Sequence, residues 1–171
     1  YNLLLYMKIL IICAMTEEEN QLKKFFNNKS DVKILKSGIG IINATLQTTK
    51  EIISNKPDII FNVGCSGSHS EDLKINDIVV GTENIPISNV IINDYNNFKY
   101  YGFRETNEMF IKSDDNLLKI ARICSLKFKD SNVKFGSIAS SDIWINNLDL
   151  IKNINNKLNT LCEEMESVSI A

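Results

Sequence analysis

The chain has 171 residues and a mass of 19.4 kDa, the size of one globular domain. Hydrophobic residues make up 44% and charged residues 23% of it, a balance that excludes a disordered chain. The 19 basic and 21 acidic side chains leave a net charge of −2, so the chain lacks the basic excess by which proteins bind nucleic acids.

The cysteines and the N-terminal segment limit the class further. The four cysteines show no C-x-x-C spacing, so we expect reduced thiols in a cytoplasmic protein, with neither a structural metal nor a disulfide framework. His69, the one histidine, follows a glycine turn and is expected to be exposed or to form a local hydrogen bond. The apolar residues 1–13 are too few to span a membrane and lack the basic start of a signal peptide. We predict a buried strand beginning near Met7, after an N-terminal extension of residues 1–6.

Short apolar runs alternate with helical stretches along the chain. In chain order we predict a strand at 9–13, a helix at 16–26, strands at 32–35, 59–63 and 77–80 with a helix at 42–54 among them, a polar and aromatic stretch at 89–108, a helix at 116–128, a strand at 133–139, a helix at 148–157 and a closing segment at 161–171. Thr16 is the expected N-cap of the first helix, with Glu19 completing a capping box. The apolar residues of the helix at 116–128 share one face. This alternation indicates an α/β fold with a mostly parallel sheet.

Small or acidic residues follow the predicted strand ends, where ligands of open α/β sheets bind. These clusters are 14–18, 37–40, 64–67 and 140–145, and a fifth lies at 163–166. Each one alone has a plainer explanation. Glycines connect strands to helices, the acidic residues 17–19 favour a helix N-terminus, and Trp144 can pack in a core. The glycines at 64 and 67 do not form the G-x-G-x-x-G fingerprint, so no dinucleotide cofactor is expected.

The order of the motifs is more specific than its parts. The chain carries AM-x-EE from Ala14, then S-G-I-G, N-x-G-x-x-G, L-K-x-x-D-I-V-V, S-x-D-x-W-I and finally E-M-E. In this order and spacing, from about Met7 to Ala171, the sequence resembles the methylthioadenosine/S-adenosylhomocysteine nucleosidases of the nucleoside phosphorylase superfamily.

The resemblance implies a single-domain, three-layer α/β fold over residues 7–171, in which helices flank a mixed, mostly parallel sheet. It implies hydrolysis of the N-glycosidic bond of 5′-methylthioadenosine and S-adenosylhomocysteine, which releases adenine and the 5′-thioribose product in nucleoside catabolism and methionine salvage. Because charge develops on the ribose, the reaction needs an activated water on one face and a protonated leaving group on the other. It also implies a homodimer without cofactor or metal, consistent with the apolar and aromatic residues between 85 and 103.

The resemblance assigns the water and the base to particular residues. Glu18 would activate the water, and Glu19 is the alternative if the register slips by one position. Trp144 would stack on adenine with its flat indole, and Ile145 would read the base edge through its main chain.

The remaining assignments concern the ribose and its 5′ substituent. Glu166 would bind the ribose hydroxyls, because one carboxylate can accept hydrogen bonds from both. Met165 would lie under the ribose, and Glu164 would anchor the segment. Ile39 would line the alkylthio pocket, where Phe98 matches an aromatic residue that the partner subunit contributes.

The sequence departs from the family pattern in two places. Cys65 stands where the family has a serine near the catalytic water, in the turn Cys65-Ser66-Gly67. A thiol is the weaker hydrogen-bonding group, so either the water is held less tightly or Ser66 takes over. The family's catalytic Asp, which helps to protonate adenine, lies well beyond E-M-E and past Ala171, so we expect the C-terminal part of the domain to be missing from this chain.

Three other functions remain open at this point. A related purine nucleoside phosphorylase would need cationic groups for phosphate, whereas the residues after the first strand are acidic and include no arginine. A futalosine-type hydrolase is a second alternative. A catalytically impaired nucleoside-binding relative is a third, favoured by Cys65 and by the expected absence of the Asp.

Overall fold

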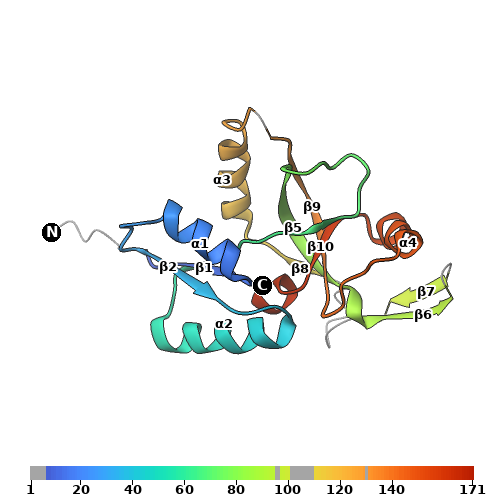
Figure 1. Ribbon diagram of the computed structural model, residues 1–171, viewed down its shortest axis with the longest axis horizontal. Coiled ribbons are helices and arrows are strands. Elements are labelled where there is room, and N and C mark those ends of the chain that lie inside the picture. The colour runs from blue at the N-terminus through green and yellow to red at the C-terminus, as the bar shows by residue number, and fades with distance from the viewer. Residues whose placement is uncertain (1–6, 95–96, 101–109, 130) are drawn as a thin grey trace. The chain divides into compact units, whose positions relative to one another are not determined.

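The structure is a computed structural model, and it describes residues 7–94, 97–100, 110–129 and 131–171 (Figure 1). Side chains are described for 7–88, 110–129 and 131–171. The chain divides into two compact units, unit 1 with Tyr1–Cys65 and Ile170 and unit 2 with Ser66–Ser169 and Ala171. We expected a single domain with one sheet, and the two units carry separate sheets. Each unit is described by itself.

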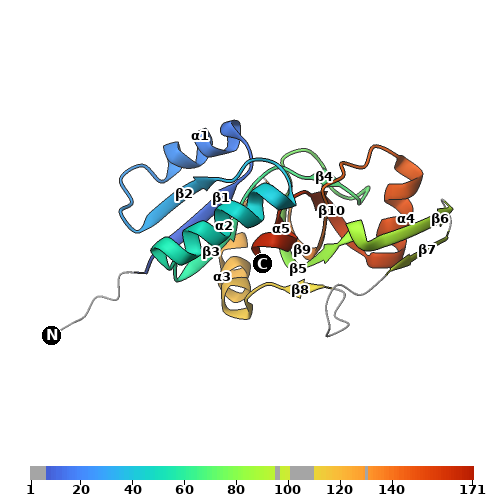
Figure 2. The same cartoon turned by 90° about the horizontal axis from the view of Figure 1, so that it is seen from below.

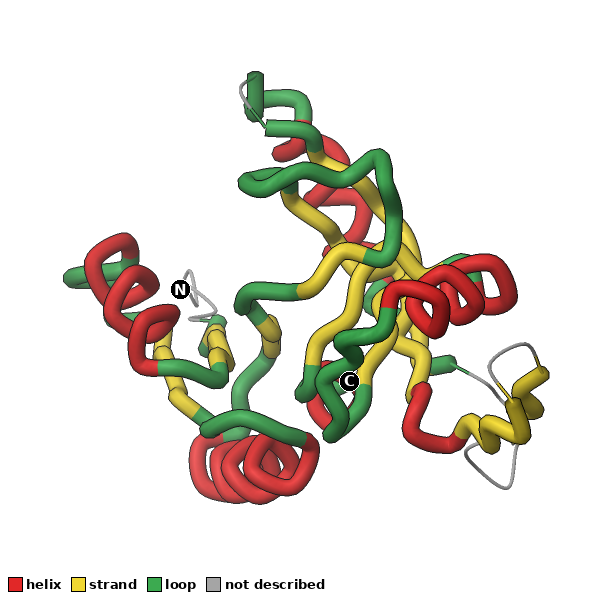
Figure 3. Tube along the Cα trace, turned by 45° about the vertical axis from the view of Figure 1, so that its right-hand side comes forward, coloured by secondary structure: helices red, strands yellow, loops and turns green. Residues whose placement is uncertain are grey.

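Unit 1 is built on a three-stranded parallel sheet in the order β2-β1-β3. Its elements, in chain order, are β1 (Ile9–Cys13), α1 (Thr16–Phe25), β2 (Val32–Lys36), α2 (Ile41–Asn55) and β3 (Ile59–Asn62). The two crossovers run in opposite directions across the sheet, so right-handed connections place α1 and α2 on opposite sides of it (Figures 1 and 3). The central strand is therefore covered on both faces, and Leu10 to Cys13 are all buried.

The ends of the two helices in unit 1 explain where the turns lie. The N-cap of α1 is Met15, and Glu18 is the third helical residue, whose carboxylate accepts the Met15 N–H. The predicted cap at Thr16 with Glu19 was therefore wrong by one position. Glu19 instead pairs with Lys23 one turn along the helix, at 2.7 Å. The turn before α2 places Gly38 and Gly40 at φ of 86° and 96°, a conformation that glycine adopts without steric cost.

Unit 2 is built on a five-stranded mixed sheet in the order β4-β10-β9-β5-β8. Its three central strands are parallel, and the two edge strands run antiparallel to their neighbours. The elements of this sheet and its helices are β4 (Gly67–Ser68), β5 (Ile78–Pro86), β8 (Ile111–Lys112), α3 (Asp115–Ser125), β9 (Val133–Ser140), α4 (Leu148–Leu158), β10 (Thr160–Glu164) and α5 (Ser167–Ile170). A hydrophobic core is formed by Ile85, Ile87, Ala139 and Ile154.

Unit 2 differs from the predicted elements in three respects. The strand predicted at 77–80 extends to Pro86 and pairs with β9 along its length. A short 3₁₀ turn (Ile87–Asn89) leads into the stretch predicted at 89–108, and that stretch contains a hairpin of β6 (Val90–Asp94) and β7 (Asn97–Tyr100), which lies at one end of the unit (Figure 2). The apolar face predicted for the helix at 116–128 is largely exposed, with Ile123 at 66%. Among the described residues, the helices are all too short or too polar to cross a bilayer.

Candidate active site

The Glu18 carboxylate is held by main-chain amides from two segments of unit 1. Its Oε2 accepts the N–H groups of Ala14 at 3.0 Å and Met15 at 2.9 Å. Its Oε1 accepts the N–H of Cys65 at 2.8 Å, 47 positions away in the sequence. A methyl group on Gly64 would stand 2.9 Å from that same oxygen, so the absent Cβ leaves the room that the carboxylate fills. Glu18 therefore has one fixed orientation, with both oxygens held as acceptors.

Glu19, the alternative to Glu18, faces a different environment. Its carboxylate is hydrogen-bonded by the Lys23 ammonium, which lowers the pKa of Glu19 below its usual value. The thiol of Cys13, at the end of β1, is buried, and burial followed by the charges of Glu18 and Glu19 raises its pKa to about 11. This thiol therefore stays protonated at neutral pH and is a poor nucleophile.

The turn after β3 contributes the main-chain N–H of Cys65, which donates to Glu18 in unit 1. This hydrogen bond does not involve the side chain of residue 65, so it is compatible with either Cys or Ser there. In unit 2, the Ser66 hydroxyl hydrogen-bonds the Cys162 thiol. Burial raises the pKa of that thiol, and the Ser66 hydrogen bond partly offsets the rise.

Ile39 lies in the turn that follows β2 in unit 1. The turn is tied to the end of β1 by the Ser37 N–H, which donates to the Cys13 carbonyl at 2.8 Å. The Asn43 side chain donates to the Ile39 carbonyl at 2.7 Å, while the Ile39 side chain is 52% exposed. Ile39 and Glu18 thus both follow the carboxyl ends of neighbouring parallel strands. Phe98 lies in β7, and its side chain is outside those that the structure describes.

In unit 2, the segment after β9 carries the predicted base-binding residues. The Ser141 hydroxyl donates to the Ile143 carbonyl and accepts the Ile143 N–H, which forms a tight turn. Trp144 follows with its side chain 55% exposed, so it is not the core residue that its type alone would suggest. Its Cη2 atom lies 3.0 Å from the position of a Cβ on Gly67, so the indole lies against the backbone of β4.

The acidic residues at the end of β10 and just after it occupy distinct positions. Glu164 accepts the N–H groups of Glu166 at 2.9 Å and Ser167 at 2.7 Å, and the Ser167 hydroxyl at 2.6 Å. Glu164 thereby holds the turn in which Met165 is half-buried and Glu166 is buried. The Val168 N–H donates to the buried Ser140 hydroxyl, which ties this turn to the end of β9.

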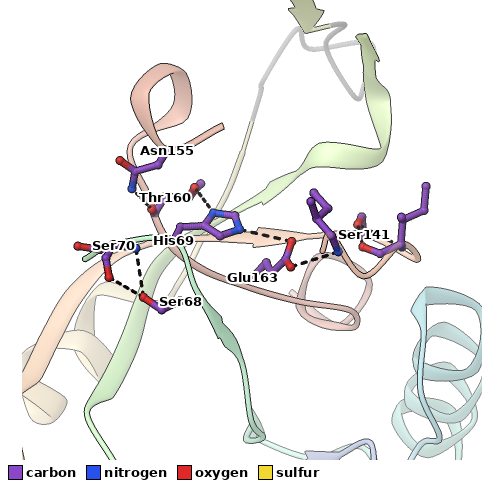
Figure 4. Close-up of polar contacts among 9 residues, drawn as sticks. Ser68, His69, Ser70, Ser141, Asn155, Thr160 and Glu163 are labelled. Carbon is purple, nitrogen blue, oxygen red and sulfur yellow. Dashed lines mark hydrogen bonds and ion pairs between the residues drawn. The ribbon is translucent and has the colours of Figure 1, made fainter. Parts of the chain in front are cut away.

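His69 and Glu163 form a buried pair that the sequence did not predict (Figure 4). The side chains are 0% and 4% exposed, and His69 Nε2 lies 3.4 Å from Glu163 Oε2. His69 Nδ1 lies 2.8 Å from the Thr160 hydroxyl, and Glu163 Oε1 accepts the Ile145 N–H at 3.3 Å. The expectation of an exposed or locally bonded His69 was therefore wrong, because its partners are 91 and 94 positions away. Glu163 was noticed only as part of an acidic cluster.

A small pocket in unit 2 borders the segment that carries Trp144. Most of its lining is aliphatic, and it consists of Ile87, Ser88, Ser141, Ile143, Ile145, Leu150 and Ile154. The pocket is therefore suited to an apolar or aromatic group.

Among the described residues there is no group of three or more His, Cys, Asp or Glu side chains that could hold a metal ion.

Comparisons with known proteins agree with the motif order. The model of the Phosphorylase superfamily matches residues 8–171. A 5′-methylthioadenosine/S-adenosylhomocysteine nucleosidase of Geobacillus sp. is 32% identical over 96% of this chain and 78% of its own length. The enzyme of the same name from Exiguobacterium sp. is also 32% identical, over 96% of this chain and 77% of its own length.

Solved structures give the same result for the fold. A Helicobacter pylori nucleosidase mutant with 5′-methylthioadenosine in its active site has a TM-score of 0.83 and 25% identity, over 96% of this chain and 78% of that chain. Futalosine hydrolase of the same species also has a TM-score of 0.83, at 23% identity over 96% of this chain and 77% of its own, which is a likeness of fold alone. The predicted α/β class and the resemblance are thereby confirmed. The chain belongs to the phosphorylase superfamily, within its 5′-methylthioadenosine/S-adenosylhomocysteine nucleosidase family.

Proposed function

We propose that this protein hydrolyses the N-glycosidic bond of 5′-methylthioadenosine and S-adenosylhomocysteine, releasing adenine and the 5′-thioribose product. The observation that carries the proposal is the fixed Glu18 carboxylate, held by the amides of Ala14, Met15 and Cys65. The family match supplies the reaction class. In this reaction Glu18 takes a proton from water, the water oxygen bonds to C1′, and the C1′–N9 electron pair leaves with adenine. Adenine takes up a proton from solvent, and Glu18 later returns its own proton to solvent.

The contacts of Glu18 favour water over phosphate as the nucleophile. Clusters of main-chain N–H groups next to a helix N-terminus are ordinary binding sites for anions. Here the anion that occupies such a cluster is the chain's own carboxylate, bonded to three amides. A phosphate approaching the same amides would meet a fixed negative charge. A phosphorylase reaction at this position is therefore disfavoured, while a neutral water can donate to the carboxylate.

Unit 2 supplies the groups that we assign to the nucleoside. Trp144 has an exposed indole face that can stack on adenine, a base–aromatic contact worth about 1–3 kcal/mol. The Ile145 N–H already donates to Glu163, so we assign its carbonyl to the adenine amino group. Glu166 is assigned to the ribose hydroxyls and Met165 to the face of the ribose.

Other parts of the proposal concern the setting of the enzyme. We place it in the cytoplasm, in nucleoside catabolism and methionine salvage, as a homodimer whose partner supplies Phe98 to the alkylthio pocket.

The homodimer is checked by light scattering, and a monomer at micromolar concentration with full activity would contradict it. The futalosine alternative has fold similarity alone in its support.

Replacing Glu18 tests the proposal directly. We expect Glu18→Gln to lower the rate of adenine release from 5′-methylthioadenosine by about a hundredfold or more, the usual contribution of a general base. Wild-type release is expected to be the same with and without inorganic phosphate. Glu19→Gln is the matched control, because it removes a neighbouring carboxylate that pairs with Lys23, and it should stay close to wild type. Phosphate-dependent release would identify a phosphorylase instead, and a Glu18→Gln rate within about tenfold of wild type would exclude Glu18 as the base.

Gly64 provides a test that leaves every acidic residue in place. In Gly64→Ala the new methyl group would stand 2.9 Å from Glu18 Oε1, so the carboxylate must move. Because the same carboxylate caps α1, we expect a small loss of stability, about 0.5–2 kcal/mol, as for the loss of a helix cap. Displacing a catalytic group by about 1 Å can cost about a hundredfold in rate, and we expect a loss of that order. Full activity in this variant would mean that the position of the carboxylate does not matter.

Trp144 is the only tryptophan, so its fluorescence reports on the proposed base site. Adding adenine should change the emission of the wild-type protein. Trp144→Ala should weaken adenine binding by about 1–3 kcal/mol, whereas Trp144→Phe should bind almost normally. The melting temperature should change little, because the side chain is 55% exposed. Normal adenine binding by the Ala variant would refute stacking.

A further inference from the structure

We propose that Glu163, held by His69, is a positioning residue that fixes the segment carrying Trp144 and Ile145. The proposal rests on the proposed function only for its ligand, because the contacts themselves lie within unit 2. Glu163 reaches from β10 to the segment after β9, and one of its oxygens accepts the Ile145 N–H at 3.3 Å. Its other oxygen faces His69 Nε2 at 3.4 Å (Figure 4).

The burial of both partners makes the pair unusual. A buried carboxylate is costly unless it is paired or hydrogen-bonded. Among the described groups, neither Glu163 Oε2 nor His69 Nε2 has a hydrogen-bond partner. The two atoms lie 3.4 Å apart, so their mutual attraction offsets the cost of burying them. His69 is itself held from two sides. Its N–H donates to the Leu161 carbonyl at 2.9 Å, and its Nδ1 lies 2.8 Å from the Thr160 hydroxyl.

The segment that Glu163 contacts is mostly exposed, and the side chain of Ile145 packs against the core of unit 2. The residues from Asp142 to Leu148 are exposed apart from the half-buried Ile145. The Ser141 turn holds the segment only as far as Ile143. The Trp144 ring itself lies against Gly67 of β4, with its Cη2 3.0 Å from the position of a Cβ there. The Glu163 carboxylate thus fixes the Ile145 amide, which is one residue along the chain from the indole.

A double apolar variant separates positioning from stability. Replacing a buried ion pair by apolar residues of similar volume is often neutral or stabilising, so we expect His69→Leu/Glu163→Leu to fold. Without the carboxylate the Ile145 amide loses its acceptor. We therefore expect acrylamide quenching of Trp144 to rise about twofold in the free protein, and adenine to bind about tenfold more weakly. Wild-type quenching and wild-type adenine affinity in this variant would overturn the proposal.

Two further variants give the test its controls. Glu163→Gln keeps an acceptor for Ile145 and can donate to His69, so it should restore quenching and affinity to within about twofold of wild type. Glu51→Gln removes another buried carboxylate, which pairs with Lys33 at 2.8 Å in unit 1, and should leave Trp144 quenching unchanged. A rise in quenching in Glu51→Gln equal to that of the double variant would show a general loosening and overturn the proposal.

A measurement on the wild-type protein decides the matter if the double variant does not fold. The Ile145 amide should exchange its hydrogen at least about tenfold more slowly than the amide of exposed Asn146. The reason is that the Ile145 N–H donates to the buried Glu163 carboxylate. Equal exchange rates would overturn the proposal. If wild-type protein fails to bind adenine, the proposed function fails at the base site, while quenching and exchange still test the positioning role.

Discussion

The contact between the Glu18 carboxylate and the Cys65 amide is the constraint on which the arrangement of the strand ends in unit 1 depends. It joins the first turn of α1 to the end of β3, so two connections that are far apart in sequence share one charge. The same carboxylate closes the N-terminus of α1 by accepting from Met15. In the proposed reaction Glu18 would both cap the helix and activate water, and one orientation would have to serve both purposes. The missing Cβ of Gly64 gives the carboxylate the space for that orientation.

Unit 2 uses adjacent carboxylates for different purposes. Glu164 accepts hydrogen bonds from the amides of the turn that follows it. Glu163 points to the other face of β10, toward His69 and Ile145. Because successive side chains of a strand point to opposite faces, neighbours in sequence reach different partners. The proposed ribose-binding residue, Glu166, then lies beyond a turn whose shape Glu164 determines.

The sequence predicted the elements of unit 1 well because its patterns are local. A continuous apolar run such as 9–13 marks a strand covered on both faces, and β1 has these bounds. The N-cap was misplaced because threonine is a common N-cap residue and methionine is not. In α1 the N-cap is Met15, and the Glu18 carboxylate accepts its N–H. The hairpin of β6 and β7 was missed because its strands are short, and the Asn and Asp residues at their adjoining ends resemble a loop. His69 and Glu163 were missed because a contact across 94 positions leaves no mark on either neighbourhood. Only the spacing of several motifs, read together as a family pattern, connected residues at this range.

The close approach of Trp144 to Gly67 also constrains how this sequence can diverge. The two indole atoms nearest to the missing Cβ are Cη2 and Cζ2, at 3.0 and 3.3 Å, and both belong to the part of the ring that phenylalanine lacks. A side chain at position 67 is therefore accommodated once residue 144 carries a smaller ring, and is obstructed while the indole is present. The effect of a substitution at Gly67 therefore depends on whether residue 144 is tryptophan or a smaller aromatic residue. A substitution at Gly67 is therefore expected to displace the indole of a residue 77 positions away in the sequence.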